Sequence, residues 1–114
     1  SQPEATEVKK MEKKSLVSYI YIGSPTINQQ AIFGTKARIQ LNDVTYSRKE
    51  VNEIQNFILA ERQSKDESEI PYMTASIKAD ANVTMGIVTD VKTELRKVNA
   101  LKINYSTKKS KDNN

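Results

Sequence analysis

The 114-residue sequence contains neither cysteine nor histidine. Without cysteine, a disulfide framework and thiolate chemistry are both excluded. Without histidine, the chain lacks the usual general base at neutral pH, the commonest metal ligand and every Ser-His or Cys-His nucleophile pair. A glycine-rich phosphate loop, a nucleophile elbow and metal-ligand spacing are absent too. We therefore expect a protein that is not an enzyme and that needs no cofactor or metal.

Long apolar runs are also missing. The longest ones, such as residues 57–60, fall far short of the roughly 18 consecutive apolar residues of a membrane-spanning helix. The length suits one domain with a modest core.

Positive charge is concentrated at the two ends of the chain. Residues 1–14 carry four lysines and three glutamates, and residues 108–114 carry three lysines and one aspartate, which leaves residues 15–107 with +1 of the total +4. A nucleic-acid-binding protein normally gathers Lys and Arg on one face and interleaves aromatic residues. Because residues 15–107 mix both signs without such a cluster, we predict no nucleic-acid partner.

Residues 73–107 read as a strand, a helix and a second strand. Alternation from Met73 to Ala79 has the two-residue period of a strand, ending near Asp80, and residues 101–106 repeat it. Between them, apolar residues recur at steps of three and four, as on an amphipathic helix: Val88, Val91, Leu95 and Val98. A helical crossover of this length predicts that the two strands are parallel.

The upstream half supplies the other elements. Residues 16–22 read as a strand with apolar residues on both faces: Val17, Tyr19 and Tyr21 on one, and Leu16, Ile20 and Ile22 on the other. This pattern predicts a strand in the centre of the sheet that is covered on both sides. Residues 26–36 read as a loop, either an insertion or a binding element, and residues 37–41 as a second strand that Val44 and Tyr46 continue after a turn.

A capping box then opens a helix. Ser47 and Glu50 have the spacing of that motif, and a buried stripe follows: Val51, Ile54, Phe57 and Ile58. The order β-β-α-β-α-β predicts a two-layer α+β domain whose sheet is covered on one face by two helices.

Several runs in the second half match one family. They are the strand end Lys78-Ala79-Asp80, the segment MGIVTDVK over residues 85–92, the segment ELRK over 94–97 and the closing LKINYS over 101–106. The chain resembles the periplasmic domain of the ExbD/TolR family, which are membrane-anchored subunits of proton-driven motors in bacterial envelopes. Met85 departs from the aromatic residue that most members carry before the glycine.

The resemblance implies an organisation and a set of partners. Residues 1–14 would be a flexible linker after a transmembrane helix that precedes this sequence, residues 15–107 the periplasmic domain, and residues 108–114 a disordered basic tail. The protein would be a single-pass inner-membrane subunit that forms a homodimer, meets an ExbB-like proton channel through that helix, and engages a TonB-like protein to energise outer-membrane transport. In the family the proton-carrying aspartate lies in that helix, so no aspartate here takes its role.

Two other functions stay open. A TolR-like subunit would serve outer-membrane integrity and contact peptidoglycan. A small α+β module of this size could alternatively bind nucleic acid.

The candidate partner-binding element is the last strand, because an exposed strand edge offers unpaired backbone groups to another chain. The residues concerned are Leu101, Lys102, Ile103, Asn104, Tyr105 and Ser106. An interior strand, already paired on both sides, is the alternative.

Four further residues receive structural interpretations. Asp80 is expected to cap the turn before the helix through backbone amides. Gly86, in the first helical turn, is expected to allow close approach of helix to sheet. Asp90 and Glu94, with Lys97 three residues beyond, are interpreted as a solvated ion-pair face rather than as paired catalytic carboxylates.

Overall fold

The computed structural model describes residues 13–108. The predictions for the linker and the basic tail fall mostly on residues 1–12 and 109–114, which lie outside this range. Strands and helices follow the order β1 (Val17–Gly23), α2 (Ile27–Phe33), β2 (Arg38–Leu41), β3 (Val44–Tyr46), α3 (Glu53–Gln63), β4 (Thr74–Asp80), α4 (Met85–Lys97) and β5 (Ile103–Lys108). Short 3₁₀ turns precede β1, α3 and β4: Lys14–Leu16, Arg48–Glu50 and Ile70–Tyr72.

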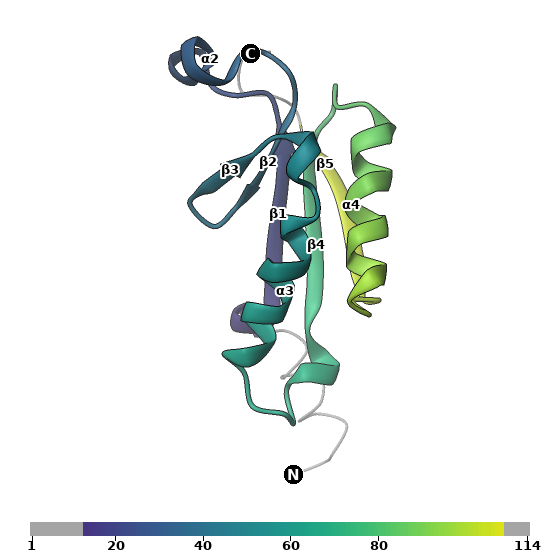
Figure 1. Ribbon diagram of the computed structural model, residues 1–114. Coiled ribbons are helices and arrows are strands. Elements are labelled where there is room, and N and C mark those ends of the chain that lie inside the picture. The colour runs from purple at the N-terminus through teal and green to yellow at the C-terminus, as the bar shows by residue number, and fades with distance from the viewer. Residues whose placement is uncertain (1–12, 109–114) are drawn as a thin grey trace.

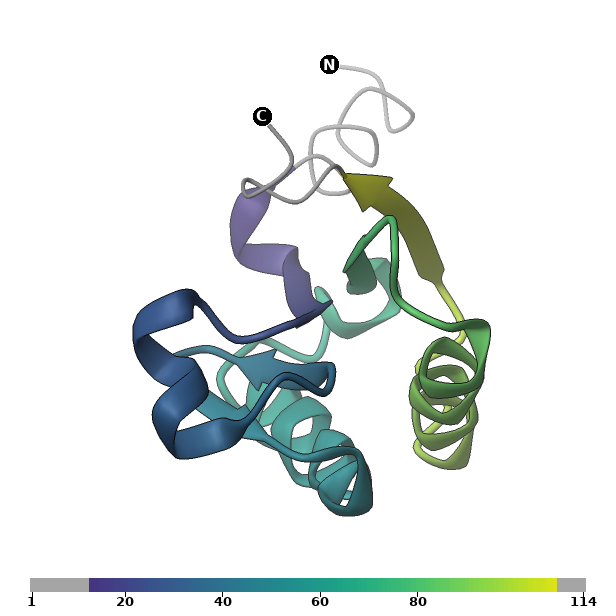
Figure 2. The same cartoon turned by 90° about the horizontal axis from the view of Figure 1, so that it is seen from above.

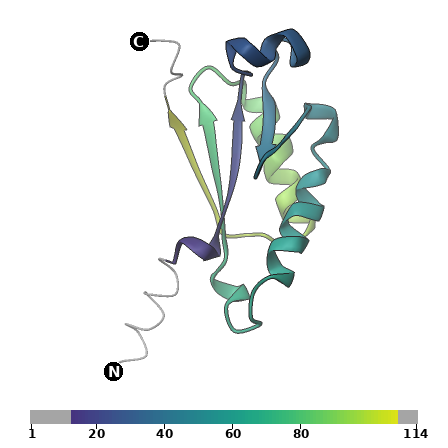
Figure 3. The same ribbon diagram turned by 90° about the vertical axis from the view of Figure 1, so that its left-hand side faces the viewer.

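One mixed sheet organises the fold, with strand order β3-β2-β1-β4-β5. β1 pairs in parallel with β4, and β4 with β5, whereas β2 is antiparallel to both β1 and β3. Helices α3 and α4 lie side by side on the same face of the sheet (Figures 1 and 3). The two-layer α+β fold predicted from the sequence is therefore confirmed, as are the central position of β1 and the parallel pairing across α4.

The core lies between the sheet and these two helices. Ile20 of β1 stands opposite Ile77 of β4, and Ile22 stands opposite Ala79, so one face of both strands is aliphatic. The predicted helical stripes cover it: Ile54 and Ile58 from α3, and Val88, Val91 and Leu95 from α4, are buried. Because each fully buried aliphatic side chain contributes about 1.5–3 kcal/mol, this layer dominates the stability of the domain.

The other face of β1 differs from the prediction. Val17 and Tyr19 are half-buried and Tyr21 is exposed, and in the described part of the chain both α3 and α4 lie across the opposite face (Figure 2). The expectation of a strand covered on both sides is therefore wrong. The tyrosines made this face look apolar, although a tyrosine ring tolerates water at its polar end.

The predicted loop over residues 26–36 contains helix α2, so that prediction is wrong as well. The helix buries none of its residues, and Ile27 and Ile32 are 72% and 78% exposed. A helix shows apolar residues at steps of three and four when one of its faces packs against a core. Helix α2 has no such face, so its sequence lacks that spacing. Gly34 ends the helix with φ 76°, a conformation that favours glycine.

The region between β2 and α3 refines the prediction. Val44–Tyr46 is a separate strand that returns along β2 after a turn at Asn42, whose φ is 53°. The capping box forms as predicted, but it opens the 3₁₀ turn Arg48–Glu50 rather than α3 itself. Helix α3 begins three residues later, at Glu53, so Val51 precedes the helix.

Candidate functional site

Strand β5 lies at an edge of the sheet, with β4 as its neighbour on one side. It runs from Ile103 to Lys108, so it begins and ends two residues later than the segment predicted from Leu101 to Ser106. Except for half-buried Ile103, all its residues are exposed. Of the two alternatives for this segment, the structure has the edge strand.

The backbone groups of β5 divide into two sets. The carbonyls of Lys102 and Lys108 accept hydrogen bonds from the amides of Ala75 and Ala81, at 2.9 and 2.8 Å. Since successive residues of a strand present their amide and carbonyl to opposite sides, the even-numbered residues of β5 face β4. The N–H and C=O of Ile103, Tyr105 and Thr107 therefore face away from the sheet, where a further strand can pair with them.

The side chains of β5 lie on the two faces of the sheet. Tyr105 is on the helical side, where its hydroxyl lies 3.8 Å from the Met85 sulfur and its ring lies 5.2 Å from the Lys92 ammonium. Ile103 packs against the core. Asn104 and Ser106 pair in register with Ser76 and Lys78 and share the opposite face. The side chains of Ile103 and Tyr105 thus anchor the strand, while the outward backbone groups of Ile103, Tyr105 and Thr107 have no partner among residues 13–108.

The opposite edge of the sheet is a poorer docking element. Strand β3 has three residues, Val44–Tyr46, against six in β5. Fewer residues offer fewer main-chain hydrogen bonds to a partner, and very short edge strands are one way in which proteins discourage pairing.

Asp80 closes β4, but its carboxylate does not cap the turn as expected. Its backbone carbonyl accepts from the Val83 amide at 3.0 Å, whereas its side chain lies over Gly23 of β1. A Cβ added at Gly23 would come within 2.9 Å of Asp80 Cγ. A side chain at position 23 would therefore force the Asp80 carboxylate to move.

Gly86 also has a different partner from the one predicted. It is exposed, and what approaches it is the side chain of Arg48 rather than the sheet. A Cβ at position 86 would lie 2.9 Å from Arg48 Nη2, and Arg48 Nε donates to Asp90 Oδ2 at 2.7 Å. The missing side chain thus lets a guanidinium cross the first turn of α4 to reach Asp90.

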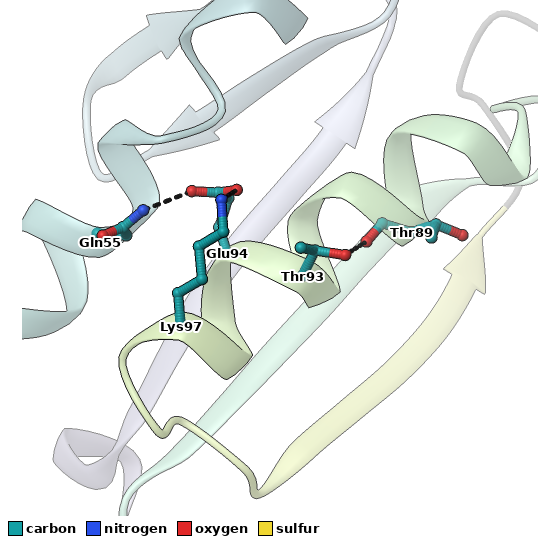
Figure 4. Close-up of polar contacts among 5 residues, drawn as sticks. All are labelled: Gln55, Thr89, Thr93, Glu94 and Lys97. Carbon is teal, nitrogen blue, oxygen red and sulfur yellow. Dashed lines mark hydrogen bonds and ion pairs between the residues drawn. The ribbon is translucent and has the colours of Figure 1, made fainter.

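Glu94 is buried, not part of a solvated face, and only 5% exposed. Gln55 of α3 donates to its Oε1 at 2.6 Å and Lys97 donates to its Oε2 at 2.9 Å (Figure 4). These hydrogen bonds, from Lys97 first and Gln55 second, lower the pKa of Glu94 below 4.5 although burial acts in the opposite direction. The charged carboxylate therefore joins the two helices through the hydrogen bond from Gln55.

The structure reveals one surface that the sequence did not predict. We call the sheet face opposite α3 and α4 the open face. By strand register it carries the aromatic residues Tyr19 and Tyr21, the basic residues Arg38, Lys78 and Lys108, and the acidic residue Asp80. Of its three basic residues, Arg38 and Lys78 come from residues 15–107, for which no basic cluster was expected, and Lys108 comes from the segment assigned to the basic tail. The alternation of side chains within β1 and β4 indicates which residues of each strand share a face. Only the pairing of these strands with each other and with β2 and β5 shows that these residues form one surface.

Within residues 13–108, no three His, Cys, Asp or Glu side chains gather in a way that could hold a metal ion. Over the same range, none of the helices is both long and apolar enough to cross a bilayer.

Comparison with known proteins gives no relative: no family model, no curated protein and no solved structure matches this chain. The function therefore has to be argued from the residues and geometry described above.

Proposed function

We propose that this chain is the periplasmic domain of an ExbD-like subunit of a proton-motive-force-driven inner-membrane motor, and that it docks other chains along β5. The observation that carries the proposal is the position of the family-like segment. Residues 78–106, which resemble the ExbD/TolR family, span the end of β4, all of α4 and most of β5. The segment therefore ends in an edge strand with outward-facing backbone groups.

Strand addition fits this edge physically. An extended partner segment would gain main-chain hydrogen bonds to Ile103, Tyr105 and Thr107, and its alternate side chains would select the register. Strand β5 contains no proline, so none of its outward amides is missing. Neither of its two side-chain sets blocks the edge, because they lie above and below the sheet.

Two partners would use the same groups. A second copy would pair β5 with β5 in a symmetric, self-complementary dimer, and a TonB-like protein would add one extended segment. Since each outward amide donates one hydrogen bond, a given edge serves one partner at a time. Addition of a TonB-like segment is therefore expected to dissociate β5-mediated dimers.

Proline substitutions test the edge, because proline removes a backbone donor. Thr107→Pro removes an outward amide at an exposed residue and leaves the bonds to β4 in place. Ile103→Pro does the same but also disturbs a side chain that packs on the core. We expect Thr107→Pro to remain folded while dimerisation, measured by sedimentation, and TonB-like segment binding, measured by amide NMR shifts, weaken at least tenfold.

Matched variants isolate the donor. Thr107→Ala keeps the amide and should behave like the wild type, whereas Ser106→Pro removes an amide that faces β4 and should destabilise the domain itself. A folded Thr107→Pro variant that dimerises and binds like the wild type would contradict the edge proposal. NMR shifts with peptidoglycan fragments but not with a TonB-like segment would assign the TolR-like role instead.

A further inference from the structure

The open face is hollowed at its end, where β1 and β4 terminate beside α2. The cavity has a volume of about 420 Å³, within the range of roughly 300–1,000 Å³ that small-molecule sites occupy. Its lining includes polar and charged residues, namely Tyr21, Arg38, Gln40, Lys78, Asp80 and Lys108. None of these residues belongs to the outward backbone edge of β5 described above.

The cavity carries more positive than negative charge. Arg38, Lys78 and Lys108 line it together with one carboxylate, that of Asp80. Among the described residues, none of these four side chains forms an ion pair within 4.0 Å. The Arg38 guanidinium is held by packing on the Phe33 ring, 4.6 Å from its centroid, and its buried Nε has no hydrogen-bond partner. Arg38 interacts electrostatically with Glu50, and an anionic ligand would place further opposite charge beside all three cations.

Aromatic rings adjoin the cations. Tyr19 and Tyr21 stack with ring centroids 6.0 Å apart and planes 20° from parallel. The ammonium groups of Lys78 and Lys108 lie 5.4 and 5.8 Å from the Tyr19 and Tyr21 centroids. Lysine side chains are flexible and Tyr21 is 37% exposed, so a ligand can reach both the ammonium groups and the ring.

Hydrogen-bond acceptors complete the lining. An ionised Asp80 can only accept hydrogen bonds, so a ligand with donor groups would match it. The Gln40 amide nitrogen donates to the Asn42 carbonyl at 3.0 Å, which leaves its amide oxygen to face a ligand. A ligand that combines an anionic group with hydroxyl donors would match both the cations and the acceptors of this lining. A bare polyphosphate has the charge but would place like charge beside Asp80.

We propose that this cavity binds an acidic sugar, as a unit of an anionic glycan. Its carboxylate would lie among Arg38, Lys78 and Lys108, its hydroxyls would donate to Asp80 and Gln40, and its ring would rest on Tyr21. This site is separate from the β5 edge and does not depend on the pairing proposed there.

The test titrates the 114-residue chain with oligogalacturonate and follows amide NMR shifts. Shifts centred on Gly23, Gln40 and Lys78 are expected, with a neutral maltooligosaccharide producing none. Absence of shifts with oligogalacturonate would overturn the proposal. Equal affinity for polyglutamate would also overturn it, because that polymer offers charge without hydroxyls or sugar rings.

Asp80→Asn is expected to change the affinities for two ligands in opposite directions. The isosteric change removes the acceptor charge, so oligogalacturonate affinity should fall about tenfold, whereas binding of a single-stranded oligonucleotide, measured alongside, should rise. A rise for both ligands would show that the face attracts polyanions by charge alone. Tightest binding of the oligonucleotide would replace the glycan with a nucleic acid.

Two lysines provide a matched pair. Lys78 and Lys92 both lie over a tyrosine ring, at 5.4 and 5.2 Å, but on opposite faces of the sheet. Lys78→Gln should weaken oligogalacturonate binding about tenfold, and Lys92→Gln should leave it unchanged. Equal effects of the two changes would contradict the assigned location. Because Lys78→Gln should leave dimerisation through β5 intact, the two proposals fail separately.

Discussion

The two faces of the sheet present different side chains from one set of strands. Beneath α3 and α4, β1 and β4 present aliphatic side chains that are almost fully buried, including Ile20 and Ile77. On the open face the same strands present Tyr21, Lys78 and Asp80. Because side chains alternate along a strand, one segment can supply both the core and the proposed ligand site from alternate residues. Substitutions at four positions of the sheet and of the helix α4 that covers it test this contrast, from the largest expected effect to the smallest.

The largest effect is expected on the covered face. Ile77→Ala removes a fully buried side chain from the centre of β4 and leaves a cavity beneath the helices. The free energy of unfolding should fall by about 2–5 kcal/mol, measured by urea titration. A loss no greater than that from a change on the open face would mean that this layer is not the core.

The next effect is expected between the covering helices. Glu94→Ala leaves the Gln55 amide and the Lys97 ammonium without their acceptor. We expect a loss of about 1–3 kcal/mol in urea unfolding. Glu94→Gln, which retains an acceptor for Gln55, should cost less. Equal losses would show that the charge, rather than the hydrogen bond between the helices, carries the interaction.

The same carboxylate predicts a pH dependence. The pKa of Glu94 is lowered in the folded protein, so its contribution is complete above 4.5 and is lost as the pH falls through the folded value. Glu50 acts in the same direction, because its hydrogen bonds from Ser47 also lower its pKa. Glu94→Gln should therefore lose less stability than the wild type between pH 7 and pH 3. Identical pH profiles would contradict a charged, hydrogen-bonded Glu94.

A smaller effect is expected at Gly86. Alanine favours a helix by up to about 1 kcal/mol over glycine, but here its Cβ would displace Arg48 and disturb the exposed pair with Asp90, which is worth about 0–1 kcal/mol. Gly86→Ala should thus change stability little in the wild type and stabilise the Arg48→Ala variant. Equal increments in the two backgrounds, measured by chemical denaturation, would show that Arg48 does not constrain position 86.

The smallest effect on stability is expected on the open face. Lys78 follows Ile77 directly in β4 but points to the opposite side, without an ion pair among the described residues. Lys78→Ala should change the free energy of unfolding by no more than about 0.5 kcal/mol. A large loss would mean that the open face also stabilises the fold.

The elements that could be predicted from the sequence are those in which buried apolar residues recur at the regular spacing of a strand or a helix. Strand β4 and helix α4 were predicted correctly because Ile77, Val88 and Leu95 face one core at regular spacing. Helix α2 was missed because it buries nothing. Glu94 was placed on a solvated face because Lys97, three residues away, offered a sufficient local partner, whereas its second partner, Gln55, lies 39 residues earlier in the chain.

Part of the candidate site was visible in the same way. The segment ending at Ser106 was recognised as a possible edge, but sequence could not decide between an edge and an interior strand. That choice depends on which strands pair, as does the direction of the amides of Ile103 and Thr107.

The sequence by itself determined that disulfide, thiolate and histidine chemistry are excluded. It also determined the two-layer architecture and the aliphatic stripes of the core, because composition and local periodicity suffice for these. Only the tertiary structure decided that β5 lies at an edge, that Arg48 crosses Gly86, and that Arg38, Lys78 and Lys108 meet beside two tyrosines. The physical reason is that these features depend on contacts between segments far apart in the chain. Strand order and register set such contacts, and local side-chain patterns do not encode them.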